Sequence, residues 1–284
     1  MCTHCINGST SRAPPFTNQD VQQGCSMSPT LFNIYIDDLI NEWKKSVDPG
    51  LRISQDKCIN MLLYADDLVI FQDTEAKLQK SIYTLHEICK EYNMRIAITK
   101  TKTMTFKGLE PVRTKIVIEN KCIEQISQFD YLGNSVSYDR DYDVDKKLQK
   151  FQRICGTISR TLKNKTRRET KIKFYKVMAK PVLSYGSELW TMTKRQESRI
   201  QASEMKFLRQ VKGCTRRDCI RNEDIRRELN VYNMNERLKR YKHQWKEHVD
   251  RMGETRIPKH IRRYKPFGRR SVGRPRGRWE DPER

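Results

Sequence analysis

The sequence predicts an α+β protein in which a mixed segment precedes an all-helical segment and a basic tail. Three patterns indicate this fold class. Short apolar runs of strand length alternate with helical patterns up to about residue 140. From residue 143 onward, apolar residues recur only at helical spacing. Residues 256–278 then hold ten lysines and arginines and no acidic residue. We therefore expect domains at 1–140, 141–253 and 254–284.

The charge of the chain indicates a polyanionic partner. The 284 residues include 57 basic and 35 acidic side chains, a formal net charge of +22. Such an excess repels itself in a compact protein unless a polyanion neutralises it. Nucleic acid is the natural partner, and a membrane surface is the rival. Because no stretch approaches the roughly 20 apolar residues of a spanning helix and no secretory signal is present, we expect a nuclear or cytoplasmic protein without membrane contact.

The first predicted elements surround an acidic pair. The opening to about residue 18 shows turn residues and little periodicity, so we expect a short hairpin there at most. A helix is predicted to begin with Ser28 as N-cap and Pro29 at its first position, and its apolar residues recur at 31, 32, 35, 36, 39 and 40. The apolar runs 61–64 and 68–71 predict a buried β-hairpin with Ala65, Asp66 and Asp67 at its tip.

The remaining elements follow from the same periodicities. Asp73 or Thr74 is expected to cap a helix with apolar positions 78, 82, 85, 88 and 92. Strands are predicted at 95–98, 103–106 and 115–118, and a turn or short strand pair at 129–133. Four helices are then predicted, with apolar stripes over 144–158, 172–182, about 194–211 and 235–252. The tail over 256–278 is predicted to be extended or disordered, because it cannot bury a core.

The nine cysteines predict reduced thiols, because their number is odd and they are widely spread. One set has zinc-ligand residue types, namely Cys214, Cys219, His243 and His248. The 23 residues between its two pairs exceed the gap of the usual short zinc modules. We therefore favour unrelated side chains over a zinc site, and a metal assay on the purified protein would decide between them.

The pair Asp66-Asp67 is the strongest candidate for chemistry. Two adjacent carboxylates at the tip of a tight hairpin repel each other, and burial of their flanks raises the cost of keeping both ionised. A divalent cation would relieve this repulsion, since Mg²⁺ prefers hard oxygen ligands. Two such ions can clamp the attacking and leaving oxygens of a phosphoryl transfer. An ordinary Asp-Asp turn is the alternative. A second candidate is the loop before Ser28, where Gly24 permits close approach of a backbone or a nucleotide, with a capped helix start as the alternative.

Taken together, these motifs resemble the reverse transcriptases of LINE-like (non-LTR) retrotransposons. The matching positions are Gln23, Gly24, Met27, Ser28, Pro29, Leu31, Phe32 and Asn33, then Tyr64 to Asp67, then Lys100 to Lys102, and then Phe129 to Gly133. Farther on, KPVLSYGSELW at 180–190 resembles a stretch after the family's palm, and VGRPRGRWED at 272–281 resembles the end of many such elements. The resemblance covers nearly the whole chain, and its ordered series of motifs is specific.

The resemblance implies a partial polymerase palm, an antiparallel sheet with two packed helices, followed by an all-α thumb and C-terminal helical region. It implies RNA-directed DNA polymerase chemistry with an RNA template, a DNA primer or duplex and deoxynucleoside triphosphates. Asp66 would ligate catalytic Mg²⁺ or Mn²⁺ with Asp67 assisting. One of Lys100 and Lys102 would lie near the departing pyrophosphate, and a solvated turn is the alternative for both lysines. The other implied contacts are Gln23 and Gly24 with the nucleotide or template, Tyr64 and Ala65 with the primer end, and Phe129, Tyr131, Leu132 and Gly133 with the primer.

Other family features have no counterpart in this sequence. The family carries another metal-binding aspartate on a palm strand upstream of the Gln23-Gly24 motif, and no residue here matches it. The fingers are absent as well. We therefore expect little or no polymerase activity from this chain alone. The alternative is a non-catalytic protein that binds nucleic acid through the thumb helices and the tail. The tail arginines expected to contact phosphates are Arg269, Arg270, Arg274, Arg276 and Arg278. A nuclear-import signal or an unbound end is the other reading of the tail.

Overall fold

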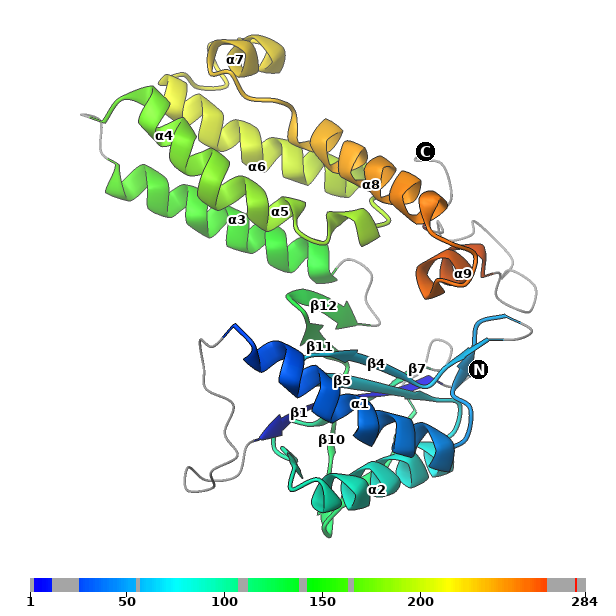
Figure 1. The fold of residues 1–284 in the computed structure, drawn as a ribbon. Helices are drawn as coiled ribbons and strands as arrows, with labels where there is room; N and C mark the ends of the chain where they lie inside the picture. The colour runs from blue at the N-terminus through cyan, green and yellow to red at the C-terminus, as the bar shows by residue number, and fades with distance from the viewer. Residues whose placement is uncertain are drawn as a thin grey trace. The chain divides into compact units, whose positions relative to one another are not determined.

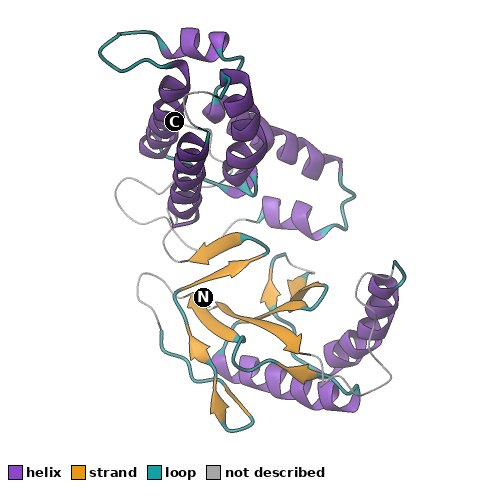
Figure 2. Cartoon of the chain, turned by 90° about the vertical axis from the view of Figure 1, so that its left-hand side faces the viewer, coloured by secondary structure: helices purple, strands orange, loops and turns teal. Residues whose placement is uncertain are grey.

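The computed structural model describes residues 3–11, 26–54, 57–106, 112–137, 142–162, 166–264 and 279. The chain divides into two compact units, Met1–Gly133 and Asn134–Arg284. Figure 2 shows the strands concentrated in the first unit and helices making up nearly all of the second. The predicted α+β class, with a mostly helical C-terminal half, is thus confirmed. No helix among the described residues is long and apolar enough to cross a bilayer.

A six-stranded sheet forms the frame of the N-terminal unit, with the order β10-β7-β1-β5-β4 and β6 paired to β1. Its strands are β1 (Thr3–Ser11), β4 (Met61–Tyr64), β5 (Asp67–Gln72), β6 (Arg95–Ile96), β7 (Lys102–Phe106) and β10 (Glu124–Gln125). The central strand is β1, which pairs antiparallel with both β5 and β7. The prediction of at most a short hairpin before residue 18 is therefore wrong. Neighbours on both sides supply the hydrogen bonds that make this segment a strand, whatever its local pattern.

Three small two-stranded sheets complete the β structure. They are β2 (Leu51–Arg52) with β3 (Cys58–Ile59), β8 (Val117–Ile118) with β9 (Lys121–Cys122), and β11 (Gln128–Tyr131) with β12 (Asn134–Ser137). The predicted strands at 95–98 and 115–118 shorten to β6 and β8, whereas the strand at 103–106 is found as β7. The short strand pair predicted around 129–133 is confirmed as β11 and β12.

Two helices cover the core of the N-terminal unit. α1 (Ser28–Ser46) and α2 (Glu75–Glu91) pack side by side, as Figure 1 shows, and share a buried cluster with β5. Thr74 caps α2, as predicted, by accepting the backbone N–H of Lys77 at 3.3 Å. Ser28, however, is not the N-cap of α1: Met27 holds that position, without a side-chain cap bond. Ser28 instead lies inside the first turn together with the proline that follows it.

Helices build nearly all of the C-terminal unit. They are α3 (Tyr142–Thr161), α4 (Arg168–Phe174), η1 (Tyr175–Ala179), α5 (Lys180–Ser184), η2 (Ser187–Leu189), α6 (Lys194–Lys212), α7 (Asn222–Glu228), α8 (Met234–Arg251) and α9 (Ile257–Arg263). The helix predicted over 172–182 is in fact interrupted by η1, a π-helical turn. Pro181 follows that turn and lacks the N–H that a regular helix would use, which favours the wider turn. The fully buried residues Phe151, Tyr175, Leu183, Ile200 and Leu208 form the centre of the core.

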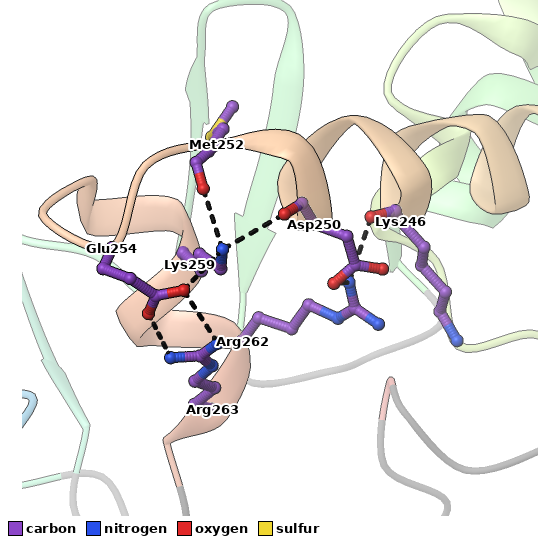
Figure 3. Close-up of polar contacts among 7 residues, drawn as sticks. All are labelled: Lys246, Asp250, Met252, Glu254, Lys259, Arg262 and Arg263. Carbon is purple, nitrogen blue, oxygen red and sulfur yellow. Dashed lines mark hydrogen bonds and ion pairs between the residues drawn. The ribbon is translucent and has the colours of Figure 1, made fainter.

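The segment predicted as an extended or disordered tail begins with a helix, α9. Lys259 donates to the backbone carbonyls of Asp250 and Met252 at 3.1 and 2.8 Å and pairs with Glu254 at 2.7 Å. Arg262 pairs with Asp250 and Arg263 with Glu254 (Figure 3). The prediction is therefore wrong for this stretch, because two acidic residues just before α9 neutralise its cations. Residues 265–278 of the predicted tail lie outside the described residues.

Candidate functional site

The acidic pair lies at the tip of the β4–β5 hairpin, as predicted. Tyr64 pairs with Asp67 across the two strands, which leaves Ala65 and Asp66 as a two-residue turn. Ala65 has a φ of +51°, in the left-handed region that tight hairpin turns require. Asp66 is exposed and Asp67 is half-buried. The turn therefore presents two carboxylates of different exposure side by side.

The same hairpin is less buried than predicted. Residues 68–70 of β5 are buried, but β4 is the edge strand of the sheet and leaves Leu62, Leu63 and Tyr64 with 38, 40 and 64% of their surface exposed. An edge strand lacks a neighbour on one side, so its side chains keep solvent contact. The exposed ring of Tyr64 and the carboxylate of Asp66 are accordingly accessible together.

Two further strands approach Asp67. In the register of the sheet, Ser9 of β1 stands opposite Asp67. The nine residues of β1, THCINGSTS, include no carboxylate. From β11, Tyr131 also comes close: burial and the negative charge of Asp67 raise the pKa of the Tyr131 hydroxyl. One of the predicted primer contacts therefore lies within electrostatic range of the predicted metal ligand.

The rest of the predicted primer-contact segment is shaped by a tight turn. Leu132 and Gly133 have φ values of +48° and +75°, both left-handed, as in a two-residue hairpin turn. Glycine adopts this conformation freely, whereas leucine does so at a cost. Phe129 and Tyr131, two residues apart on β11, share the half-buried face of the strand.

The structure separates the two candidate lysines. Lys102 forms an ion pair with Glu124 on the neighbouring strand β10. Lys100 is exposed, and within the described part of the chain it forms no ion pair. Its backbone N–H bonds to the Ala97 carbonyl at 3.0 Å in the turn before β7. Through β1, Lys102 is level with Val69 of β5, and the two strands run in the same direction. Asp67 lies two residues before Val69, and Lys100 lies two residues before Lys102. Lys100 is therefore at the same end of the sheet as Asp67.

The donor set fits only one side of a two-metal site. Asp66 and Asp67 offer hard carboxylate oxygens of the kind that Mg²⁺ and Mn²⁺ accept. However, no group of three or more His, Cys, Asp or Glu side chains that could hold a metal is found among the residues that the structure describes. A pair of ions that clamps two oxygens needs ligands from more than one side. Among the described strands, the position of β1 that faces Asp67 is Ser9, which is not a carboxylate.

Other predicted site residues lie elsewhere or outside the described ranges. Gln23, Gly24, Arg269, Arg270, Arg274, Arg276 and Arg278 lie outside the described residues. The four zinc candidates do not gather into a metal-binding group within those ranges. His243 instead pairs with Glu247 at 3.2 Å, and the ring of His248 lies 5.5 Å from that of Trp245.

Sequence reasoning missed the central position of β1. No signal in the segment itself could have revealed it, because Asn7-Gly8 has the composition of a turn. The strand becomes evident only from its pairing with β5 and β7.

Known proteins are similar to this chain in sequence. Residues 2–136 match the family described as reverse transcriptase (RNA-dependent DNA polymerase). A transposon-derived protein of Caenorhabditis elegans is 23% identical over 78% of this chain and 82% of its own length. The RNA-directed DNA polymerases from transposon BS of Drosophila melanogaster and from the mobile element jockey of Drosophila funebris are each 23% identical, over 84 and 83% of this chain. The chain spans 27 and 26% of these two polymerases, about a quarter of their length.

Proposed function

We propose a function from the premise that residues 2–136 are a reverse transcriptase domain, distantly homologous to the RNA-directed DNA polymerases of non-LTR retrotransposons. In this proposal the chain carries part of a polymerase palm, followed by a thumb and a basic C-terminal region. The observation that carries it is the tight β4–β5 turn, which presents Asp66 and Asp67 with Tyr131 close by.

Each residue of this site has a proposed role. Asp66 and Asp67 bind the divalent metal, and Tyr64 with Ala65 lines the end of the primer. Phe129 to Gly133 contact the primer strand. Of the two lysines, Lys100 is the better candidate for the pyrophosphate, because Glu124 already engages Lys102. Gln23 and Gly24 are proposed to contact the nucleotide or template.

We further propose that the chain alone polymerises little or no DNA. The support is the strand beside Asp67: β1 offers Ser9 at the facing position and no carboxylate along its length. A metal held by Asp66 and Asp67 alone lacks the ligands that bridge two ions.

Two measurements test this proposal. Primer extension on a homopolymer template with Mg²⁺ or Mn²⁺ should give no product above background, and robust extension would refute the inactivity. Titration with Mn²⁺, followed by electron paramagnetic resonance, should detect weak binding that the double variant Asp66→Asn, Asp67→Asn loses. The matched control is Asp37→Asn, Asp38→Asn, which removes two adjacent, exposed aspartates on α1. Equal loss in both double variants would contradict a site at the hairpin.

A second candidate function is nucleic-acid binding without catalysis. The net charge of +22 favours it, since binding to phosphates needs no intact metal site. We expect binding to single- and double-stranded oligonucleotides that weakens steeply as salt rises. Removal of residues 265–284 leaves α9 in place and should reduce the salt dependence, because it deletes the arginines of the tail. Binding that is unchanged by this truncation would exclude the tail from the interface.

A further inference from the structure

The C-terminal unit contains a groove that the proposed polymerase site does not use. One wall comes from α5, η2 and the turn between them, and the other comes from α8. Its lining includes Tyr185, Gly186, Glu188, Arg237, Tyr241 and Trp245. We call it the α8 groove. Its volume of about 520 Å³ is in the range of ligand-binding clefts.

The first wall of the α8 groove is rigid. Gly186 has a φ of +69°, and a Cβ at this position would lie 1.8 Å from Oδ1 of Asn134. Lys147 donates to that same oxygen at 2.6 Å and to the backbone carbonyl of Tyr185 at 2.8 Å. Its ammonium also lies 5.5 Å from the centre of the Tyr185 ring. Tyr185 is thereby fixed at the groove while 56% of its surface stays exposed.

The second wall is one face of α8. Arg237, Tyr241, Trp245 and His248 recur at the spacing of a single helical face. Nη2 of Arg237 donates to the hydroxyl of Tyr241 at 2.9 Å, and the guanidinium lies 5.3 Å from the Tyr241 ring. Trp245 is half-buried, so part of its ring faces solvent. The two walls therefore combine aromatic surface with a cationic group.

The cationic group lacks a counter-charge. Among the described residues, no carboxylate pairs with Arg237, and its buried Nε has no hydrogen-bond partner. Burial first, and then the charge of Arg237, lower the pKa of the buried Lys180. A guanidinium that no carboxylate pairs with favours an anion. Glu188 is the acidic residue of the lining, so an anion is expected at the Arg237 end of the groove.

We propose that the α8 groove binds single-stranded nucleic acid, with unpaired bases stacked on Tyr185 and Trp245 and a backbone phosphate on Arg237. This inference rests on the proposed nucleic-acid-binding function of the chain. Aromatic side chains stack on bases of any sequence, but only where the bases are not already paired in a duplex. Proline-rich peptides also fit aromatic grooves, yet their prolines carry no anionic group to pair with the guanidinium of Arg237. The charge complementarity therefore favours nucleic acid.

Two lysines of α8 lie against an aromatic ring of the protein itself. The ammonium groups of Lys242 and Lys246 lie 5.7 and 5.0 Å from the centre of the Trp279 ring. The same helix thus accommodates an aromatic plane beside basic side chains, which is the arrangement that the proposal requires for a stacked base.

The test uses the full chain and a fluorescein-labelled oligonucleotide of about ten nucleotides, either oligo(dT) or oligo(U), read by anisotropy. Tyr185→Ala and Trp245→Ala should each weaken binding at least about fivefold, whereas Tyr185→Phe and Trp245→Phe should retain it, because phenylalanine still stacks. Arg237→Gln should weaken binding and lower the salt slope by about one. The matched controls are Tyr232→Ala, a residue outside the groove with 71% of its surface exposed, and Arg240→Gln on the exposed side of α8.

Each outcome decides a different point. Ultraviolet crosslinking of an iodouridine-containing oligonucleotide should attach it to Tyr185 or Trp245, and mass spectrometry identifies the site. If the wild type binds but the groove variants match the controls, the groove proposal is overturned and the general binding function stands. If the wild type binds no oligonucleotide, the binding function itself fails. If a duplex competes as well as a single strand, stacking on unpaired bases is overturned.

Discussion

The indole N–H of Trp279 donates a 2.7 Å hydrogen bond to the backbone carbonyl of Glu188, 91 residues earlier in the chain. This bond joins the two motifs at 180–190 and 272–281 whose purpose the sequence leaves open. Together with Lys242 and Lys246, which lie against the ring, it fixes the residue to α8 and η2. The indole of Trp279 is therefore engaged within the protein. Its role in this structure is that of an anchor.

Removing the anchor should loosen the C-terminal end locally. We expect Trp279→Ala to lose about 1–2 kcal/mol of local docking free energy, the sum of one hydrogen bond and the contacts with the lysines. Hydrogen–deuterium exchange should rise at η2 and in the middle of α8. Trp279→Phe keeps the ring but removes the N–H, so its exchange should be intermediate. Identical protection in all three proteins would show that the contact is not populated in solution.

A buried charged network stabilises the C-terminal unit. Glu204 is fully buried on α6, where Nη2 of Arg226 donates to Oε2 at 2.8 Å and the hydroxyl of Tyr175 donates to Oε1 at 3.0 Å. We expect Glu204→Gln to destabilise the protein by about 3–5 kcal/mol, because Arg226 would be left as a buried, unpaired charge. Urea unfolding followed by circular dichroism measures the loss.

Tyr175, which donates to the same carboxylate, provides a matched comparison. Tyr175→Phe removes a single hydrogen bond to a charged acceptor and should cost about 1.5–3 kcal/mol. The double variant should cost less than the sum of the two single changes, because both remove the same contact. Strict additivity would contradict the coupling of Tyr175 with Glu204.

Sequence patterns predicted those elements whose own residues show strand or helix periodicity. The apolar runs around Asp66 and Asp67 gave the hairpin, and the stripes from residue 143 gave the main helices of the C-terminal unit. Ile200, Glu204 and Leu208 share one helical face, so a carboxylate within an apolar stripe was a visible sign of a buried network.

The elements that could not be predicted depend on partners distant in the sequence. β1 is a strand because β5 and β7 pair with it, and α9 is a helix because Asp250 and Glu254 neutralise it. The closeness of Tyr131 and Asp67 depends on how β11 meets the sheet, which no local pattern encodes. The family resemblance identified the residues of the candidate site. The position of Ser9 opposite Asp67, by contrast, is known only from the strand register.

Two glycines should respond oppositely to the same substitution. Gly186→Ala places a methyl group against Asn134 at a left-handed φ, so we expect a loss of more than about 1–2 kcal/mol. Gly156 lies inside α3 with nothing within 4 Å of the added Cβ, so Gly156→Ala should stabilise by about 0.5–1 kcal/mol. Thermal unfolding of both variants beside the wild type provides the measurement. A stabilised Gly186→Ala would contradict the tight contact with Asn134.

Burial should divide the cysteines by reactivity. It raises the pKa of the Cys89 thiol to about 11 and that of Cys155 to about 12, whereas Cys58, Cys122 and Cys219 are exposed. Since the thiolate is the nucleophile, we expect iodoacetamide at neutral pH to label the three exposed residues and to spare the two buried ones. Mass spectrometry of the digested protein assigns the sites. Labelling in urea is the control, because all five should then react, and equal labelling without urea would contradict the burial.

The docking of α9 should depend on acid pH. The side-chain hydrogen bonds of Lys259 and then Arg263 lower the pKa of Glu254 from its ordinary 4.5 to about 2. Because the folded pKa is the lower one, the contact contributes its full stability above pH 4.5 and loses it as the pH falls toward 2. Amide NMR signals of α9 should therefore shift toward disordered values within that window.

Single substitutions distinguish the contribution of Glu254 to the docking of α9 from those of the neighbouring acidic residues. Glu254→Gln should release the Arg263 side of α9 already at neutral pH, leaving the pairing of Arg262 with Asp250, whose pKa is also lowered by that arginine. Glu247→Gln removes an exposed acid of α8 that pairs with His243, and it should leave α9 unchanged. High salt should also release α9. At 1 M ionic strength the Debye length is about 3 Å, so the attraction between these exposed charges is screened. A helix α9 that remains docked below pH 3 would mean that packing, rather than the ion pairs, holds it.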